Sequence, residues 1–158
     1  MRRPRGGRLA LVLLLVAAAV ALAADFIRRS EALPAGPVDV VWDRTACAEC
    51  RMTVSERAYA AQLQLKDGRV LDFDDAGCLF RFQAHDGDAP HATYFRAVHG
   101  DGWLPAGKAA FVRAGPSPMG YDLGAVPAGT PDSFSVAEAR ALVVGDGGGA
   151  AGEGGHAR

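Results

Sequence analysis

An apolar stretch near the N-terminus restricts the fold of this chain more than any other feature. Residues 9–24, LALVLLLVAAAVALAA, carry no charge, and the segment MRRPRGGR before them carries four arginines and no acidic residue. This pattern is typical of an export segment, whose positive end stays in the cytoplasm. We therefore expect the remaining chain to lie on the periplasmic side of the inner membrane of a bacterial host and to build its core without this segment.

Two fates are open to the apolar segment. The sequence ALAA at 21–24 offers signal peptidase an Ala-x-Ala site at Ala21 and Ala23. Extended to Ile27, however, the stretch is almost long enough to span about 30 Å of hydrocarbon. We predict that residues 1–27 are a signal or anchor segment that holds the protein to the inner membrane. Cleavage near Ala23, which would release a soluble protein, is the alternative.

The rest of the chain divides by composition into a linker, a domain and a tail. Residues 28–37, RRSEALPAGP, are charged at first and then rich in Ala and Pro, as a linker would be. Residues 145–158 are glycine-rich and have nothing to bury, which predicts disorder. Residues 38–144 therefore form the folded domain. The chain has a formal net charge of -1, so it lacks a basic field that would attract nucleic acid, and we expect no such partner.

The patterning of residues 38–144 predicts an α+β fold. The segment AQLQLKDGRVLDF alternates apolar residues on both sides of an Asp67-Gly68 turn, which is typical of a β-hairpin. A helix capped by Asp74 or Asp75 is expected to follow it. The remaining predicted elements are strands at residues 93–99, 108–115 and 119–127 and a helix with capping-box spacing at Ser135 and Glu138. This order predicts helices packed on a largely antiparallel sheet.

The sequence TACAECRMTV concentrates sulfur in one short segment. Cys47 and Cys50 form a Cys-x-x-Cys pair, and a strand here would project the sulfurs of Cys50 and Met52 from one face. Thiolate and thioether donors together select soft ions such as Cu(I). Zinc usually requires four nitrogen or sulfur ligands, and a second cysteine pair is absent. A local disulfide in an oxidising compartment is the alternative to a metal site.

Met119 is a candidate for a distant ligand. It lies in GPSPMGYD, a loop stiffened by prolines, where a core side chain is not expected. Filling a gap at the edge of the core is the other interpretation of Met119. Cys78, next to apolar residues in the first turn of the predicted helix, is expected to be buried as a small hydrophobic residue. The histidines that could complete a metal site, none with a partner at ligand spacing, are His85, His91 and His99.

Three blocks of the sequence resemble the NosL family, the copper-binding accessory proteins of nitrous oxide reductase assembly. The blocks are CAECRM, YAAQLQLKDGRVLDFDDAGCL and SPMGYDL, and they occur in this order. The resemblance implies two related β-β-α-β-like halves, similar to the fold of organomercurial lyase, and a Cu(I) site. The positions that match the family's Cys-x-x-Cys-Gly-Met and Met-Gly blocks are Cys47, Cys50, Met52, Met119 and Gly120.

The chain departs from the family pattern in two respects. Arg51 stands where the family usually has glycine, which changes the freedom of the backbone and brings a cation that should favour thiolates nearby. Family members are typically lipoproteins, whereas no cysteine ends the apolar segment of this chain. The chain would therefore rely on its N-terminal helix to reach the membrane.

Residue chemistry and the resemblance together predict an extracytoplasmic metallochaperone and not an enzyme. Its Cu(I) ligands would be Cys47, Cys50, Met52 and Met119. The resemblance implies delivery of copper to a partner metalloenzyme, nitrous oxide reductase with its maturation machinery. The alternative is a periplasmic thiol-disulfide oxidoreductase that uses Cys47 and Cys50, although the pair does not open a helix after a buried strand, the usual way to lower the pKa of the attacking thiol. Fold analogy alone suggests an organomercurial-lyase-like enzyme.

Overall fold

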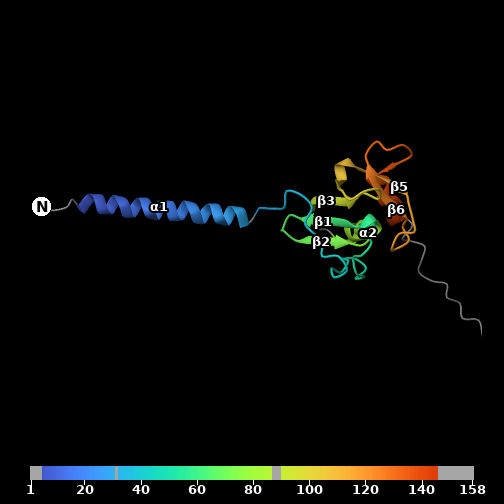
Figure 1. Ribbon diagram of the computed structural model, residues 1–158, viewed down its shortest axis with the longest axis horizontal. Coiled ribbons are helices and arrows are strands. Elements are labelled where there is room, and N and C mark those ends of the chain that lie inside the picture. Colours follow the sequence, from blue (N-terminus) through green and yellow to red (C-terminus); the bar gives the residue numbers. More distant parts are fainter. Residues whose placement is uncertain (1–4, 31, 87–89, 146–158) are drawn as a thin grey trace, which may run out of the picture. The chain divides into compact units, whose positions relative to one another are not determined.

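The computed structural model describes residues 5–30, 32–86 and 90–145 and contains two compact units, Met1–Leu33 and Pro34–Arg158 (Figure 1). The first unit consists of one helix, and the second contains both sheets. The predicted tail lies outside the described residues except for Gly145, which ends the last helix.

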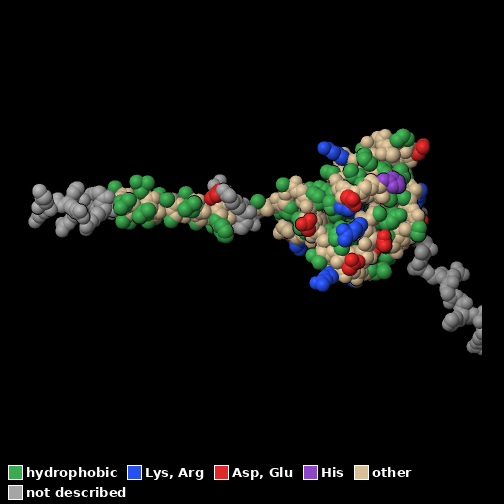
Figure 2. Space-filling view, in the orientation of Figure 1, with side chains coloured by type: hydrophobic (Ala, Val, Ile, Leu, Met, Phe, Trp, Pro, Cys, Tyr) green, Lys and Arg blue, Asp and Glu red, His purple; other side chains and the backbone are tan. Residues whose placement is uncertain are grey.

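The first unit is the helix α1, Arg5–Ser30. Its window Ala10–Ile27 has a mean hydropathy of 2.7 over 18 residues, and none of that window is buried. Figure 2 shows hydrophobic side chains along this helix, whereas the visible face of the second unit mixes hydrophobic, acidic and basic side chains. At 1.5 Å per residue, 18 residues measure about 27 Å, close to the hydrocarbon thickness of a bilayer. The predicted apolar helix is confirmed, and by length and composition it is able to cross a membrane.

The first sheet of the second unit is antiparallel, with the strand order β2-β1-β3-β4 (Figure 1). The predicted hairpin is confirmed, because Leu63 pairs with Leu71 and the turn contains Gly68 at φ 89°, a conformation that glycine adopts without strain. The sequence patterns did not predict the short fourth strand. The strands are β1 Ala61–Leu65, β2 Val70–Phe73, β3 Pro90–Arg96 and β4 Trp103–Pro105.

Both faces of β1 are buried, although its alternating pattern predicted a single apolar face. The side-chain amide of Gln62 donates to the Val38 carbonyl and accepts from the Val38 N–H, and Gln64 donates to the Gly36 carbonyl. Gly36, in the predicted linker, and Val38, at the start of the predicted domain, thus cover the polar face of the strand. These hydrogen bonds offset much of the cost of burying two glutamines, although the Gln64 Oε1 has no hydrogen-bond partner among the described residues.

The second sheet is antiparallel and has the strand order β6-β5-β7. Its last strand leads into α3, Val136–Gly145, and the predicted capping box is present, since Ser135 N–H donates to Glu138 and Glu138 N–H donates to the Ser135 hydroxyl. The short strand β7 was not predicted. The strands are β5 Ala109–Arg113, β6 Leu123–Pro127 and β7 Phe134–Ser135. The α+β class is confirmed, and the order β1-β2-α2-β3 of the first half has the expected β-β-α-β form.

The helix α2, Ala76–His85, lies against strands of both sheets and against α3. Three fully buried rings join the halves: Phe80 of α2 lies 5.6 Å from both Phe95 of β3 and Phe111 of β5, and Phe95 lies 5.0 Å from Phe111, between ring centroids. Offset or edge-to-face aromatic contacts add to the free energy gained by burial. The two sheets therefore share one core.

Replacing Phe111 with alanine should destabilise both halves together. Phe111→Ala leaves a cavity between α2, β3 and β5, and we expect the free energy of unfolding to fall by about 3–5 kcal/mol. Val41→Ala, at a side chain that is 59% exposed, should change it by less than about 0.5 kcal/mol. Denaturant titration followed by tryptophan fluorescence measures both. Two separate transitions in Phe111→Ala, with only one shifted, would contradict a shared core.

Candidate metal site

The Cys-x-x-Cys segment forms a tight loop and not the strand that would have put the sulfurs of Cys50 and Met52 on one face. Cys47 N–H donates to the Met52 carbonyl at 2.7 Å, and Arg51 N–H donates to the Cys47 carbonyl at 3.1 Å. Arg51 has φ 67°, in the left-handed region that favours glycine. The loop therefore explains why a Cys-x-x-Cys-Gly-Met block would place glycine here.

Three cysteine sulfurs meet beside this loop. The Sγ atoms of Cys47, Cys50 and Cys78 all lie within 4.8 Å of one another, and all three cysteines are free. Cys47 and Cys78 are buried, and Cys50 is partly exposed. The predicted burial of Cys78 is confirmed, but it belongs to a sulfur cluster and does not merely fill the core. No local sequence pattern reveals this, because the loop and α2 come together only through the tertiary fold.

A cavity of about 310 Å³ opens onto this cluster. Met119, from the loop between β5 and β6, lines the cavity together with Cys50 and Cys78. The structure therefore brings Met119 to the cysteines across about seventy residues of sequence. Met52 is not among the residues that line this cavity, and its side chain is 53% exposed. The full lining is Glu49, Cys50, Cys78, Arg81, Met119 and Tyr121.

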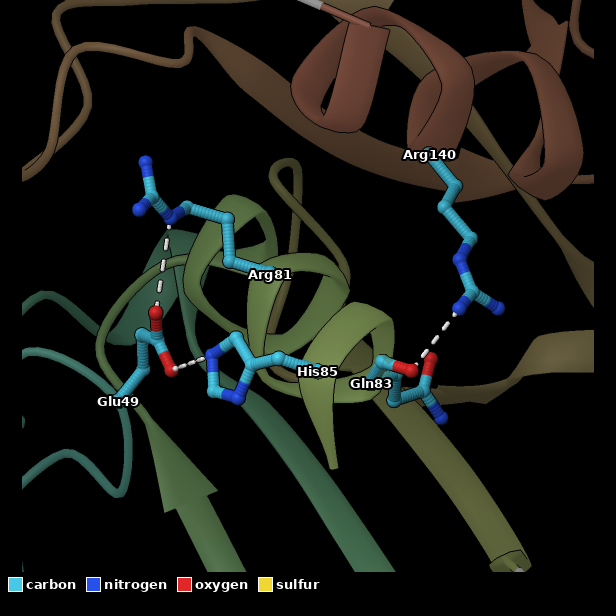
Figure 3. A network of polar contacts seen from close by, with 5 residues as sticks. All are labelled: Glu49, Arg81, Gln83, His85 and Arg140. Atoms are coloured by element: carbon cyan, nitrogen blue, oxygen red, sulfur yellow. Dashed lines mark hydrogen bonds and ion pairs between the residues drawn. The ribbon is translucent and has the colours of Figure 1, made fainter. Parts of the chain in front are cut away.

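Polar side chains also line the cavity. Glu49 contacts two groups of α2, with Arg81 Nε at 3.5 Å and His85 Nε2 at 3.0 Å, and the three are drawn together in Figure 3. Arg81 also contacts the Tyr121 hydroxyl, which raises the pKa of Arg81. In the same figure, Arg140 of α3 donates to the Gln83 carbonyl in the last turn of α2. Glu49, next to Cys50, is thus held in place by the helix that carries Cys78.

The three candidate histidines lie in different places. His85 contacts Glu49, which lines the cavity, whereas His91 contacts the Pro34 carbonyl at 3.3 Å. His99 is exposed in the segment after β3. Of the three, His85 is therefore the histidine that contacts a residue of the sulfur site, although it does not itself line the cavity.

Hydrogen bonds make Cys47 the most acidic thiol of the cluster. A hydrogen bond from the Cys78 thiol, together with backbone N–H groups of Cys50, Asp74 and Glu49, lowers the pKa of Cys47 from 9.0 to about 5, against the opposing effect of burial. The pKa of Cys78 is raised, because its proton is held in that hydrogen bond and because it is buried. Burial raises the pKa of Cys50. Hydrogen bonds, and not the Arg51 guanidinium that the sequence suggested, are the main causes of this acidity.

The cluster has the size of a metal site. A metal–thiolate bond of about 2.3 Å in a planar arrangement of three ligands requires sulfurs about 4 Å apart, and the observed limit of 4.8 Å is compatible with this spacing. Thiolate and thioether donors favour soft ions of low charge. Among the described residues, this cluster is the group of metal-binding side chains that the fold assembles.

Comparison with known proteins identifies a solved structure with a similar fold. No protein-family model matches the sequence, and no curated protein matches it. The arrangement of sheets and helices does have a counterpart among solved structures. In particular, the chain is similar to the crystal structure of the copper chaperone NosL from Shewanella denitrificans, with a TM-score of 0.50, 20% identity and coverage of 71% of this chain and 89% of that chain. At this identity the similarity shows a shared fold, and the NosL-like fold expected from the sequence is confirmed.

The metal-free protein should contain a cysteine thiolate that persists far below the usual range. We expect the ultraviolet absorbance of thiolate to titrate with a midpoint near pH 5, since the pKa of Cys47 is about 5. Cys78→Ala removes the strongest donor and should move the midpoint upward, and Cys47→Ser should abolish the transition. Because the pKa in the fold lies below the ordinary 9.0, the stability contributed by this thiolate is greatest above pH 9 and is lost as pH falls toward 5. A midpoint near 9 in the parent would contradict the assignment.

Proposed function

We propose that this protein is an extracytoplasmic Cu(I)-binding metallochaperone. The observation that carries the proposal is the convergence of three cysteine sulfurs on one point, beside a cavity lined by a methionine. These donors are all soft, as Cu(I) requires. The shared fold with a copper chaperone supports the same conclusion.

The proposed ligands have different roles. Cys47, Cys50 and Cys78 hold the ion, and Met119 supplies a thioether from the other side of the cavity. Met52, a ligand in the sequence-based prediction, is exposed beside the loop, and we propose that it acts as an outer donor while copper enters or leaves. A cavity much larger than one ion leaves room for a donor from a partner, so that a new bond forms before an old one breaks.

Donor type also favours Cu(I) over Zn(II). Metal-bound cysteines are thiolates, so binding of either ion releases the protons of Cys50 and Cys78, whose pKa values are raised in the metal-free protein. The thioether of Met119, which lines the cavity, is a soft donor that suits Cu(I), whereas the protein ligands of Zn(II) are cysteine, histidine and carboxylate groups.

A thiol-disulfide oxidoreductase fits the site less well. An attacking thiol must be both accessible and ionised. Here the acidic thiol, Cys47, is 0% exposed, whereas the accessible thiol, Cys50, has a raised pKa. The two properties are divided between two residues, which favours metal binding and not disulfide exchange as the function of the pair.

The proposal also covers the cellular location of the protein and the recipient of its copper. The helix α1 would anchor the protein to the inner membrane with the domain in the periplasm, as its length and the arginines before it suggest. The recipient of copper would be a metalloenzyme of that compartment, nitrous oxide reductase with its maturation machinery, on the resemblance of the sequence to the NosL family. The protein would carry the ion without catalysing a reaction.

The reduced full-length protein in detergent micelles should bind one Cu(I) tightly and Zn(II) much more weakly. Competition against a chromophoric Cu(I) chelator measures the first affinity, and a zinc-sensitive dye measures the second. Retention of Zn(II) as tight as that of Cu(I) would contradict a copper site and favour a structural zinc site.

The two methionines provide a matched pair of variants for the ligand assignment. Met119→Leu keeps volume and hydrophobicity, so the free energy of unfolding should change by less than about 1.5 kcal/mol while Cu(I) affinity falls. Cys50→Ser should lower affinity further, because serine supplies neither charge nor a soft donor. Met52→Leu should leave affinity nearly unchanged and slow the transfer of copper to the chelator. Equal affinities of Met119→Leu and the parent would refute the assignment of Met119.

The protein should fractionate with the membrane and keep its N-terminal segment. Release of the domain by protease added to spheroplasts, but not to intact cells, would place the domain in the periplasm. Mass spectrometry of the purified chain identifies its first residue. A mature protein that begins at Ala24 or Asp25 would show cleavage by signal peptidase and rule out the anchor.

A further inference from the structure

We propose that the carboxylate of Asp75 is the positioning group of the copper site, which holds Met119 where its sulfur and that of Cys78 reach the same ion. The proposal deepens the function proposed above and rests on it. Asp75 is not a ligand in this arrangement. It acts through Met119, whose N–H it accepts, and through the first turn of α2, which carries Cys78.

Asp75 contacts both segments that it would position. It is the N-cap of α2 and is 0% exposed. Its Oδ1 accepts the Gly77 N–H at 2.8 Å, which fixes the first turn of the helix that carries Cys78. Its Oδ2 accepts the Ser117 hydroxyl at 2.6 Å and the Met119 N–H at 3.3 Å. One buried carboxylate therefore joins the backbone of Met119 to that of Gly77, the residue before Cys78.

The loop that carries Met119 is tied to Asp75 as a unit. Ser117 N–H donates to Asp122 Oδ1 at 2.9 Å, and Asp122 N–H donates to the Ser117 hydroxyl at 3.0 Å, so the turn is closed at its base. The Ser117 hydroxyl donates in turn to Asp75. The ring of Tyr121 lies so close to Gly77 that a Cβ there would overlap it. A ring contact tolerates sliding, whereas hydrogen bonds to a carboxylate are directional and fix the position of the loop.

The neighbouring aspartate, Asp74, fixes the position of the Cys-x-x-Cys loop. Asp74 Oδ1 accepts the N–H groups of Ser55 and Glu56 at 2.8 and 3.2 Å, which anchors the chain just after the Cys-x-x-Cys loop. The Asp74 backbone N–H also contacts the Cys47 sulfur. Adjacent carboxylates thus hold the cysteine loop on one side and the methionine loop on the other. The segment FDDAGC, residues 73–78, therefore contacts both the Cys-x-x-Cys loop and the Met119 loop and itself carries Cys78.

Pre-positioning matters to affinity because a ligand on an untethered loop must be ordered when copper binds, at a cost in free energy. Asp75→Asn tests this with little change in shape. The asparagine oxygen can still cap Gly77, but its amide then presents a donor to the Met119 N–H, which loses its acceptor, and the hydrogen bond with the Ser117 hydroxyl is reversed. We expect Cu(I) affinity to fall about tenfold, the effect of losing a hydrogen bond to a charged group.

The decisive measurement is a double-mutant cycle with Met119→Leu, in the full-length protein in detergent. If Asp75 acts by positioning Met119, Asp75→Asn should cost about tenfold in the parent and less than about twofold when Met119 is already leucine. The matched control is Asp72→Asn, a half-buried carboxylate whose side chain accepts from Gln62 at 2.8 Å. It should leave Cu(I) affinity unchanged in both backgrounds.

Each other outcome overturns the proposal in a distinguishable way. An equal loss in both backgrounds means that Asp75 only stabilises the fold, while the Met119 dependence of the parent keeps the proposed function intact. A parent that binds no Cu(I), or binds it independently of Met119, overturns the proposed function and the role of Asp75 together. If circular dichroism shows that Asp75→Asn does not fold, the same cycle is run with Ser117→Ala, for which we expect about a threefold loss that again depends on Met119.

Discussion

The hydrogen bonds of two buried carboxylates at the junction of β2 and α2 are the constraint on which the rest of the structure depends. Asp74 and Asp75 are 2% and 0% exposed, and an ionised carboxylate without partners would be far too costly at such positions. Their partners are N–H and O–H groups from residues 55–56, 77 and 117–119. The need to satisfy these carboxylates therefore draws three separate segments to one point, and each of these segments lies near a cysteine or methionine of the candidate site.

The site lies at the seam between the two halves of the domain. The cysteines belong to the first half, on the loop before β1 and on α2, whereas Met119 belongs to the second half, between β5 and β6. The shared aromatic core sets the distance between these halves, because close-packed rings cannot slide without opening voids. A complete set of donors therefore exists only in the folded domain. On the proposed function, packing far from the sulfurs would therefore contribute to the affinity for an ion.

The elements with strong local signals were predictable from the sequence. The hairpin followed from its Asp-Gly turn, α2 from its aspartate cap and α3 from its capping box, and all three are present. The short strands β4 and β7 carried too few residues to form a pattern. The Cys-x-x-Cys loop was not recognised as a tight turn, because Arg51 occupies a left-handed conformation for which glycine is the usual signal. The glutamines of β1 looked exposed, because nothing local shows that residues 36–38 cover them.

The sequence by itself determined the apolar helix, the α+β class and the soft chemistry of the site, because charge, hydrophobic period and donor type are properties of the residues themselves. It also pointed to Met119, since a methionine between Pro118 and Gly120, in a loop stiffened by prolines, is out of place as a core residue. Only the tertiary structure decided which sulfurs meet. Cys78 joins the cluster and Met52 turns outward. Hydrogen bonds and packing between segments far apart in the sequence fix the distances between the sulfurs. A sequence pattern, which is local, does not record those contacts.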